Sequence, residues 1–194
     1  MARKQSISKE SLLDQAVKIA EEQGILAVTS RSVAQAAGCS IQPVFSHFPT
    51  MEELRKQTFL HACQIVENEY MGDIQQEEDG FDSTIRRILG LARSKPNLYK
   101  LCYLSGNDYS VGPENPSMAF QSNRMFLQIL QAESGLDIYT CQDIFMRSLM
   151  MIYGIATMIC VNGMEYSDDM AREMIHRTLG DMIFAASAKI SRDI

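Results

Sequence analysis

Residues Thr29–Leu54, TSRSVAQAAGCSIQPVFSHFPTMEEL, decide the fold of this chain. Apolar residues at helical spacing lead up to Gly38, and glycine adopts the left-handed backbone of a tight turn without strain. A second short helix begins after Ser40, and Thr50 with Glu53 forms a T-x-x-E capping box that starts a third. The spacing therefore predicts a helix, a tight turn, a short helix, a second turn and a long helix.

The two short helices around Gly38 predict a helix-turn-helix. In such units the second helix enters the DNA major groove and its first residues reach the base edges. The spacing alone leaves an alternative open, because many all-helical proteins carry a glycine between two short helices.

The rest of the chain also has helical periodicity and contains no convincing alternating strand. Further helices are expected from Ser8 to Gly24, Met51 to about Glu77, Phe81 to Arg93, Pro96 to Leu104, Pro116 to about Ser134, Thr140 to Asn162 and Ser167 to Ile190. These patterns predict an all-α fold, with an N-terminal three-helix DNA-binding domain at residues 1–50 and a larger helical effector-binding and dimerisation domain at 51–194.

Charge is distributed unevenly along the 194 residues, whose formal net charge is −6. Residues 1–60 carry seven Lys/Arg and six Asp/Glu (+1), and residues 61–194 carry eleven and eighteen (−7). The acidic total argues against indiscriminate binding to nucleic acid or anionic membranes. The N-terminal third is therefore the part suited to approach a phosphate backbone.

Cysteine usage and hydropathy predict a cytoplasmic protein without a membrane segment. The five cysteines are scattered and odd in number, which is typical of reduced thiols. The polar start MARKQSISKES has no apolar signal region, and the longest apolar stretch, Leu149–Val161, is too short to span a bilayer.

The detail of the opening stretch resembles the N-terminal domain of the TetR family of transcriptional regulators. That family has the run T-x-R-x-[IV]-A-x-x-A-G-[VC]-S, followed by an aromatic residue, H-F and an E-x-L helix start. The positions that match are Thr29, Arg31, Val33, Ala34, Ala37, Gly38, Cys39, Ser40, Phe45, His47, Phe48 and Leu54. The match covers about residues 8–60, and KPNLYKLCYL and MMIYGIATMI resemble, more loosely, a C-terminal domain type of the family.

The resemblance implies a ligand-responsive transcriptional regulator, expected to be a repressor, that binds a palindromic double-stranded DNA operator as a homodimer. A small apolar or amphipathic effector of unknown identity would release it. The implied DNA-binding residues are Thr29, Arg31, Ser40, Ile41, Gln42, Pro43, Phe45, His47 and Thr50. Arg31 would reach a base or a phosphate, Gln42 could pair with adenine, and Ile41 and Pro43 could pack on a thymine methyl.

Two departures from the family pattern keep an alternative open. Phe45 replaces the usual Tyr and Met51 the usual Lys, which removes two phosphate contacts. A ligand-binding or scaffold protein of the same fold without DNA binding is the alternative function. Single residues also have alternatives, because Phe45 and Phe48 favour core positions that seat the short helix, and His47 could simply pack.

The larger domain carries two sets of candidate residues. An effector pocket is expected from Phe59, Cys63, Tyr99, Tyr103, Phe126, Met146, Met150 and Tyr153. The resemblance implies a dimer interface on the last two helices, from Phe145, Leu149, Ile152, Ala156, Ile175, Leu179, Met182 and Ala186. The alternative for both sets is a plain intramolecular core.

Catalysis is not expected. The chain has three histidines and contains no G-x-S-x-G, H-E-x-x-H or P-loop pattern. His61 and Cys63 lie two apart, which does not suit two metal ligands on one helix face. The sequence predicts no catalytic residues, no metal site and no cofactor.

Overall fold

The computed structural model describes residues 7–70, 80–105 and 121–190, and every regular element among them is a helix. This confirms the predicted all-α fold. The described residues fall into two compact units, the first within Met1–Val66 and Lys95–Met118, the second within Glu67–Ser94 and Ala119–Ile194. The domain boundary expected at residue 50 remains a prediction.

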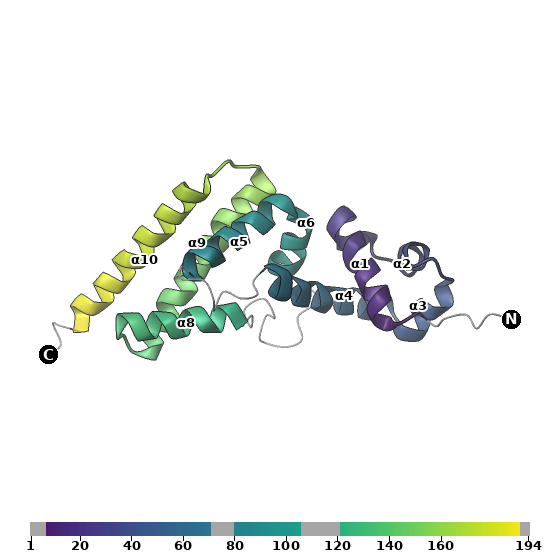
Figure 1. Ribbon diagram of the computed structural model, residues 1–194, viewed down its shortest axis with the longest axis horizontal. Coiled ribbons are helices and arrows are strands. Elements are labelled where there is room, and N and C mark those ends of the chain that lie inside the picture. Colours follow the sequence, from purple (N-terminus) through teal and green to yellow (C-terminus); the bar gives the residue numbers. More distant parts are fainter. Residues whose placement is uncertain (1–6, 71–79, 106–120, 191–194) are drawn as a thin grey trace. The chain divides into compact units, whose positions relative to one another are not determined.

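The first unit surrounds a small apolar core. Its elements are α1 (Lys9–Gln23), the 3₁₀ turn η1 (Ile25–Ala27), α2 (Ser30–Ala36), α3 (Ile41–His47), α4 (Met51–Ile65), α6 (Pro96–Tyr99) and the π-helical turn η4 (Lys100–Leu104). Helix α1 packs against α2, α4 and α6, and α2 packs against α3 (Figure 1). The fully buried side chains Leu12, Val33, Val44, Phe48 and Leu54 join these helices into one core.

Side chains cap three of these helices, at Ser8, Thr29 and the predicted Thr50. Ser8 accepts from the Ser11 N–H at 3.1 Å to start α1, and Thr50 accepts from the Glu53 N–H at 3.1 Å to start α4. The reciprocal half of the expected box at Thr50 is missing, because the Glu53 carboxylate accepts a hydrogen bond from the Gln57 amide at 3.0 Å.

The complete capping box lies instead at the start of α2. Thr29 accepts from the Ser32 N–H at 3.0 Å, and the Ser32 hydroxyl accepts from the Thr29 N–H at 2.9 Å. This box fixes the first turn of the helix that precedes the tight turn.

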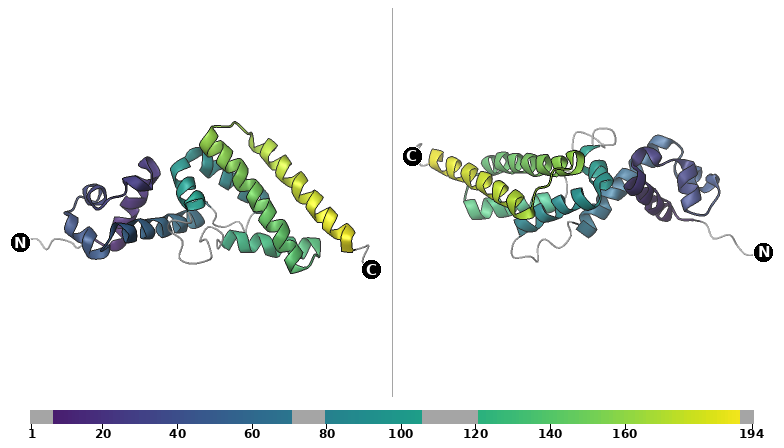
Figure 2. Two further views of the ribbon diagram at one scale, coloured as in Figure 1. Left: turned by 180° about the vertical axis from the view of Figure 1, so that it is seen from behind. Right: turned by 90° about the horizontal axis from the view of Figure 1, so that it is seen from above.

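The second unit is built around one long apolar helix, α9 (Ile138–Asn162). Helices α5 (Gly80–Ser94), α8 (Gln121–Ser134) and α10 (Asp168–Ile190) pack against it, and α9 and α10 run side by side (Figure 2). Helix α9 begins two residues earlier than the expected Thr140, because Asp137 caps it by accepting from the N–H groups of Tyr139 and Thr140.

Ion pairs tie α10 to α5 at two points. Near the start of α5, Asp82 contacts His176 and lies 3.4 Å from Arg172. Near its end, Arg93 contacts Asp168 and donates to the Tyr166 carbonyl at 2.6 Å. Each pair is partly exposed, so these contacts orient the helices more than they stabilise them.

By length and composition, α9 is the one helix among the described residues that could cross a membrane, with a mean hydropathy of 1.8 over its best window. Nine of its side chains are buried within the second unit, including Ile144, Leu149 and Ile155. That burial identifies α9 as the central core helix of the unit.

Two expected loop segments, residues 75–80 and 105–116, fall almost wholly outside the described ranges, as does the predicted end of the long helix near Glu77. Within the described part of that helix, α4 gives way after Ile65 to the π-helical turn η2 (Val66–Tyr70).

Candidate DNA-binding site

The turn between α2 and α3 is a Schellman motif centred on Gly38, whose φ of +64° lies in the left-handed region. The Cys39 N–H donates to the Ala34 carbonyl at 3.0 Å and the Gly38 N–H to the Gln35 carbonyl at 3.2 Å, which satisfies two open carbonyls of α2. A β-carbon at Gly38 would strain this backbone, so the glycine sets the angle at which the chain leaves α2.

Helix α2 holds Arg31 exposed one residue after its start. The opposite side of α2 buries Ser30, Val33 and Ala34 in the core. Thr29 is half-buried, and its hydroxyl donates to the Ser32 hydroxyl at 3.0 Å while accepting in the capping box. The Thr29 hydroxyl would therefore contact a DNA backbone while it also makes the hydrogen bonds that cap α2.

Helix α3 is anchored by its inner face, where Val44 is fully buried and Phe48 follows as the buried C-cap. Its outer face is apolar at two positions, because Ile41 is 37 % and Phe45 is 49 % exposed. The expectation that Phe48 seats the helix is confirmed, and the corresponding core placement of Phe45 is wrong. Four residues separate Ile41 from Phe45, so the two lie side by side on the helix surface.

The remaining residues of α3 are polar or restrict its backbone. Gln42 is exposed, Pro43 is half-buried near the helix start, and Ser46 donates to the Gln42 carbonyl at 3.0 Å. Ser40 is the N-cap of α3, but unlike Ser8, Thr29 and Thr50 it makes no side-chain capping bond. Pro43 lacks the N–H that a third-position cap would bind, which explains this difference.

His47 and Thr50 lie exposed at the far end of α3 and the start of α4. The Nε2 atom of His47 is 3.3 Å from the Ile7 carbonyl, which links the end of α3 to the residue before α1. Lys9 lies close by, with its Nζ 5.6 Å from the centre of the Phe48 ring and 3.2 Å from the Gln57 amide oxygen.

Two side chains of α4 turn towards the protein and not away from it. The Ser30 hydroxyl donates to the Met51 sulfur at 3.3 Å, so Met51 packs on the start of α2. Arg55 donates to the Val28 carbonyl at 3.4 Å and to the Leu26 carbonyl at 3.3 Å. Arg55 thus positions the segment that leads into Thr29, a role that the sequence pattern did not reveal because it depends on carbonyls 27 and 29 residues away.

The nine side chains named from sequence therefore belong to one continuous stretch, from the cap of α2 to the cap of α4. Four of these side chains are exposed and make no hydrogen bond or ion pair with other described residues, namely Arg31, Ile41, Gln42 and Phe45. Because Lys9 and Arg55 are engaged by the fold, Arg31 is the cation best placed next to α3. Such a surface offers hydrogen-bond donors and apolar contacts but little positive charge.

The pocket candidates lie in both units. In the first unit Phe59, Cys63 and Tyr99 are buried, and Tyr103 stacks on Tyr99 with ring centres 5.1 Å apart. A hydrogen bond that the Cys102 thiol donates to Cys63, together with burial, raises the pKa of Cys102 beside this cluster. In the second unit Met146 and Tyr153 are half-buried, Met150 is 66 % exposed, and the side chain of Phe126 is outside the described set.

Five of the eight dimer candidates are buried inside the second unit, namely Phe145, Leu149, Ile152, Ala156 and Ile175. Leu179, Met182 and Ala186 on α10 are half-buried. Large apolar side chains that remain exposed on the same two helices are Tyr139, Met150, Met158, Val161, Met170, Met174 and Phe184. The periodic apolar residues of α9 are thus buried in the core of their own unit. An interface with a partner chain stays a prediction.

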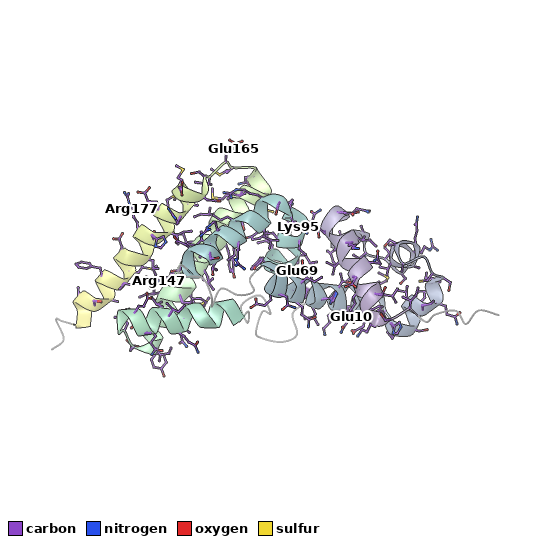
Figure 3. The ribbon with its side chains drawn as sticks, viewed as in Figure 1. Glu10, Glu69, Lys95, Arg147, Glu165 and Arg177 are labelled. Atoms are coloured by element: carbon purple, nitrogen blue, oxygen red, sulfur yellow. The ribbon has the colours of Figure 1, made fainter. Side chains whose placement is uncertain are left out.

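An open groove of 630 Å³ lies between the first half of α9 and the second half of α10. Its lining includes Tyr139, Asp143 and Met182, and Arg147, labelled in Figure 3, pairs with Asp143 at 2.8 Å. None of the eight pocket candidates lines this groove. Among the described residues no three His, Cys, Asp or Glu side chains gather in a way that could hold a metal ion.

Residues 12–58 match the family described as bacterial regulatory proteins, tetR family. Among curated proteins no significant match is found. Fourteen chains of solved structures match significantly, and those described next share the fold over most of this chain.

The chain is similar to a transcriptional regulator from Rhodococcus sp. Rha1, with 17 % identity and a TM-score of 0.66 over 93 % of this chain and 98 % of that one. It is also similar to a putative transcriptional regulator from Pseudomonas aeruginosa PAO1, with 11 % identity and a TM-score of 0.67 over 93 % of this chain and 92 % of that one. The multidrug binding protein EbrR, solved with imidazole, is 19 % identical, with a TM-score of 0.58 over 87 % of this chain and 93 % of that one.

At these identities the solved structures support the fold, and the match over α1 to α4 supports the family. Residues 12–58 are therefore a helix-turn-helix DNA-binding domain of the TetR family of bacterial regulatory proteins, and the chain shares the fold of the solved structures named above.

Proposed function

We propose that this protein is a ligand-responsive repressor that binds a palindromic DNA operator as a homodimer in the cytoplasm and releases it on binding a small molecule. The observation that carries the proposal is the outer face of α2 and α3. Arg31, Gln42 and Phe45 are exposed there, while Val33, Val44 and Phe48 hold the two helices to the core. A rigidly seated short helix with an exposed donor face is what reading of a major groove requires.

Two-fold operators suit two-fold proteins, since one short helix offers too little contact for specific binding. The exposed apolar side chains of α9 and α10, with Phe184 77 % and Met150 66 % exposed, supply a surface for a second copy of the chain. Leu179, Met182 and Ala186 extend this surface along α10.

The effector class is inferred from the four pocket candidates of the first unit, Phe59, Cys63, Tyr99 and Tyr103, which are aromatic and thiol side chains without a carboxylate or cation among them. Such a lining favours a small apolar or amphipathic molecule. EbrR has been solved with malachite green and with proflavin, and these aromatic dyes are suitable first probes for this chain.

The test is a selection of duplexes from a random pool by the purified protein, followed by titration of the selected duplex with each dye. We expect a two-fold symmetric consensus, and release of the duplex as dye binding is observed by fluorescence. Retention of no duplex above background would reject the repressor and favour the alternative, a ligand-binding protein of this fold without DNA binding. Dye binding without release would reject the ligand response alone.

A further inference from the structure

The outer face of α3 carries two large apolar side chains that the fold does not need. Ile41 is 37 % and Phe45 is 49 % exposed, whereas Val44 and Phe48 on the inner face are buried and already seat the helix. The spacing of four residues brings Ile41 and Phe45 together, and we call this pair the apolar reading face.

Polar chemistry on α3 is limited. The helix contains no Lys, Arg, Asp or Glu. The Ser46 hydroxyl donates to the Gln42 carbonyl, and the Nε2 atom of His47 lies 3.3 Å from the Ile7 carbonyl. The Gln42 amide is therefore the main exposed hydrogen-bonding group beside the apolar reading face.

Base edges in the major groove differ in what an apolar side chain can contact. Guanine, adenine and cytosine present polar atoms, and thymine also presents its 5-methyl group. A phenyl ring or an isoleucine placed on a polar edge removes water from it without replacing the hydrogen bond, which is unfavourable. On a methyl group the same side chains bury apolar surface on both partners.

We infer that Phe45 and Ile41 read thymine 5-methyl groups, so that this protein requires thymine where α3 docks. The inference rests on the proposed DNA-binding function and goes beyond it by naming the base chemistry and assigning Phe45 as a specificity-determining residue. The ring that replaces the usual tyrosine contributes apolar readout in place of a phosphate contact.

The experiment compares two versions of the duplex selected from the random pool, one as selected and one resynthesised with uracil in place of thymine in both half-sites. Uracil keeps the base pair and removes only the methyl group. We expect the wild-type protein to bind the uracil duplex about fourfold more weakly for each contacted methyl group. Phe45→Ala should lose the part of this preference that its own contacts supply, and a Phe45→Ala, Ile41→Ala double variant should bind both versions with nearly equal affinity.

Leu26→Ala is the matched control, because Leu26 is an apolar side chain that is 75 % exposed in the same unit but belongs to η1 and not to α3. This variant should keep the full thymine preference. Ile41→Ala provides a second, independent variant, and circular dichroism establishes that each protein is folded before binding is measured.

Equal binding of the two duplexes by the wild-type protein would overturn the inference while leaving DNA binding intact. An undiminished thymine preference in folded Phe45→Ala and Ile41→Ala would overturn it as well, because the preference would then arise from duplex flexibility. A protein that retains no duplex at all would overturn the inference together with the proposed function, and the binding measurement separates these cases.

Discussion

At the scale of single residues, Arg31 is the exposed cation that α2 holds beside the turn. Arg31→Ala should weaken binding of the selected duplex by about 1–3 kcal/mol and relax base choice, because a guanidinium can bind guanine O6 and N7 together. Fluorescence anisotropy with the selected duplex and single-base variants measures both effects.

Lys18→Ala is the control for Arg31→Ala, since Lys18 is an exposed cation on α1 and its removal changes the net charge equally. It should leave affinity nearly unchanged. Equal affinity of Arg31→Ala and the wild-type protein would remove Arg31 from the binding site.

Thr29 has a structural role that can be separated from any DNA contact. Thr29→Ala removes the capping box that starts α2 and should lower the free energy of unfolding by about 1 kcal/mol. Thr29→Ser keeps the hydroxyl and should retain most of that stability. Urea denaturation followed by circular dichroism is the measurement, and an unchanged midpoint for Thr29→Ala would show that the cap is not formed in solution.

Local chemistry explains which residues could be placed from sequence. Gly38 and Thr29 were predictable because their requirements, a positive φ and an oxygen facing a helix start, involve only near neighbours. Phe45 was not, since exposure depends on whether Val44 and Phe48 already fill the core. Arg55 was missed for the same reason, because its carbonyl partners come from a distant part of the chain.

At the scale of elements, α9 depends on its N-cap. Hydrogen bonds from the Thr140 hydroxyl and backbone, with one from the Tyr139 N–H, lower the pKa of the Asp137 carboxyl. Because the folded-state pKa lies below the unfolded one, the charged cap stabilises the fold above the ordinary aspartate pKa of about 3.9. That contribution is lost as the pH falls through the folded-state pKa.

Asp137→Asn keeps an oxygen for the cap but removes the charge. We expect its melting temperature to lie below that of the wild-type protein at neutral pH, with the difference shrinking as the pH falls below about 4. Glu133→Gln, at an exposed carboxylate on α8, is the control and should show no such dependence. A difference between Asp137→Asn and the wild-type protein that does not vary with pH would contradict the charge-based explanation.

Periodicity predicted the existence and approximate bounds of α9 and α10 but not which partner each apolar side chain meets. Leu149 and Ile152 recur at the spacing expected of an interface, and both are buried within their own unit. Apolar residues spaced three or four apart predict that one face of a helix is buried. They do not predict the partner that buries it, which for α9 depends on the packing of α5 and α8.

At the scale of the whole molecule, the proposed function requires two copies of the chain. We expect sedimentation to give a dimer in dilute solution. Phe184→Glu should shift it towards monomer without loss of helicity, because Phe184 is exposed and a charge there opposes burial against a partner.

Leu26→Glu, at an equally exposed apolar position outside α9 and α10, should leave the dimer intact. A wild-type protein that sediments as a monomer with normal helicity would contradict the two-fold arrangement. A Phe184→Glu dimer of wild-type strength would place the interface on another surface.

We propose that this chain recognises a specific DNA sequence through α2 and α3. The most direct measurement is the ratio of its affinities for the selected duplex and for a scrambled duplex of equal length and composition, at one physiological salt concentration. We predict a ratio of about 10³ or more for the wild-type protein, which should fall by about 30-fold or more in an Arg31→Ala, Gln42→Ala double variant that remains folded. Equal affinity of the wild-type protein for both duplexes would contradict the claim.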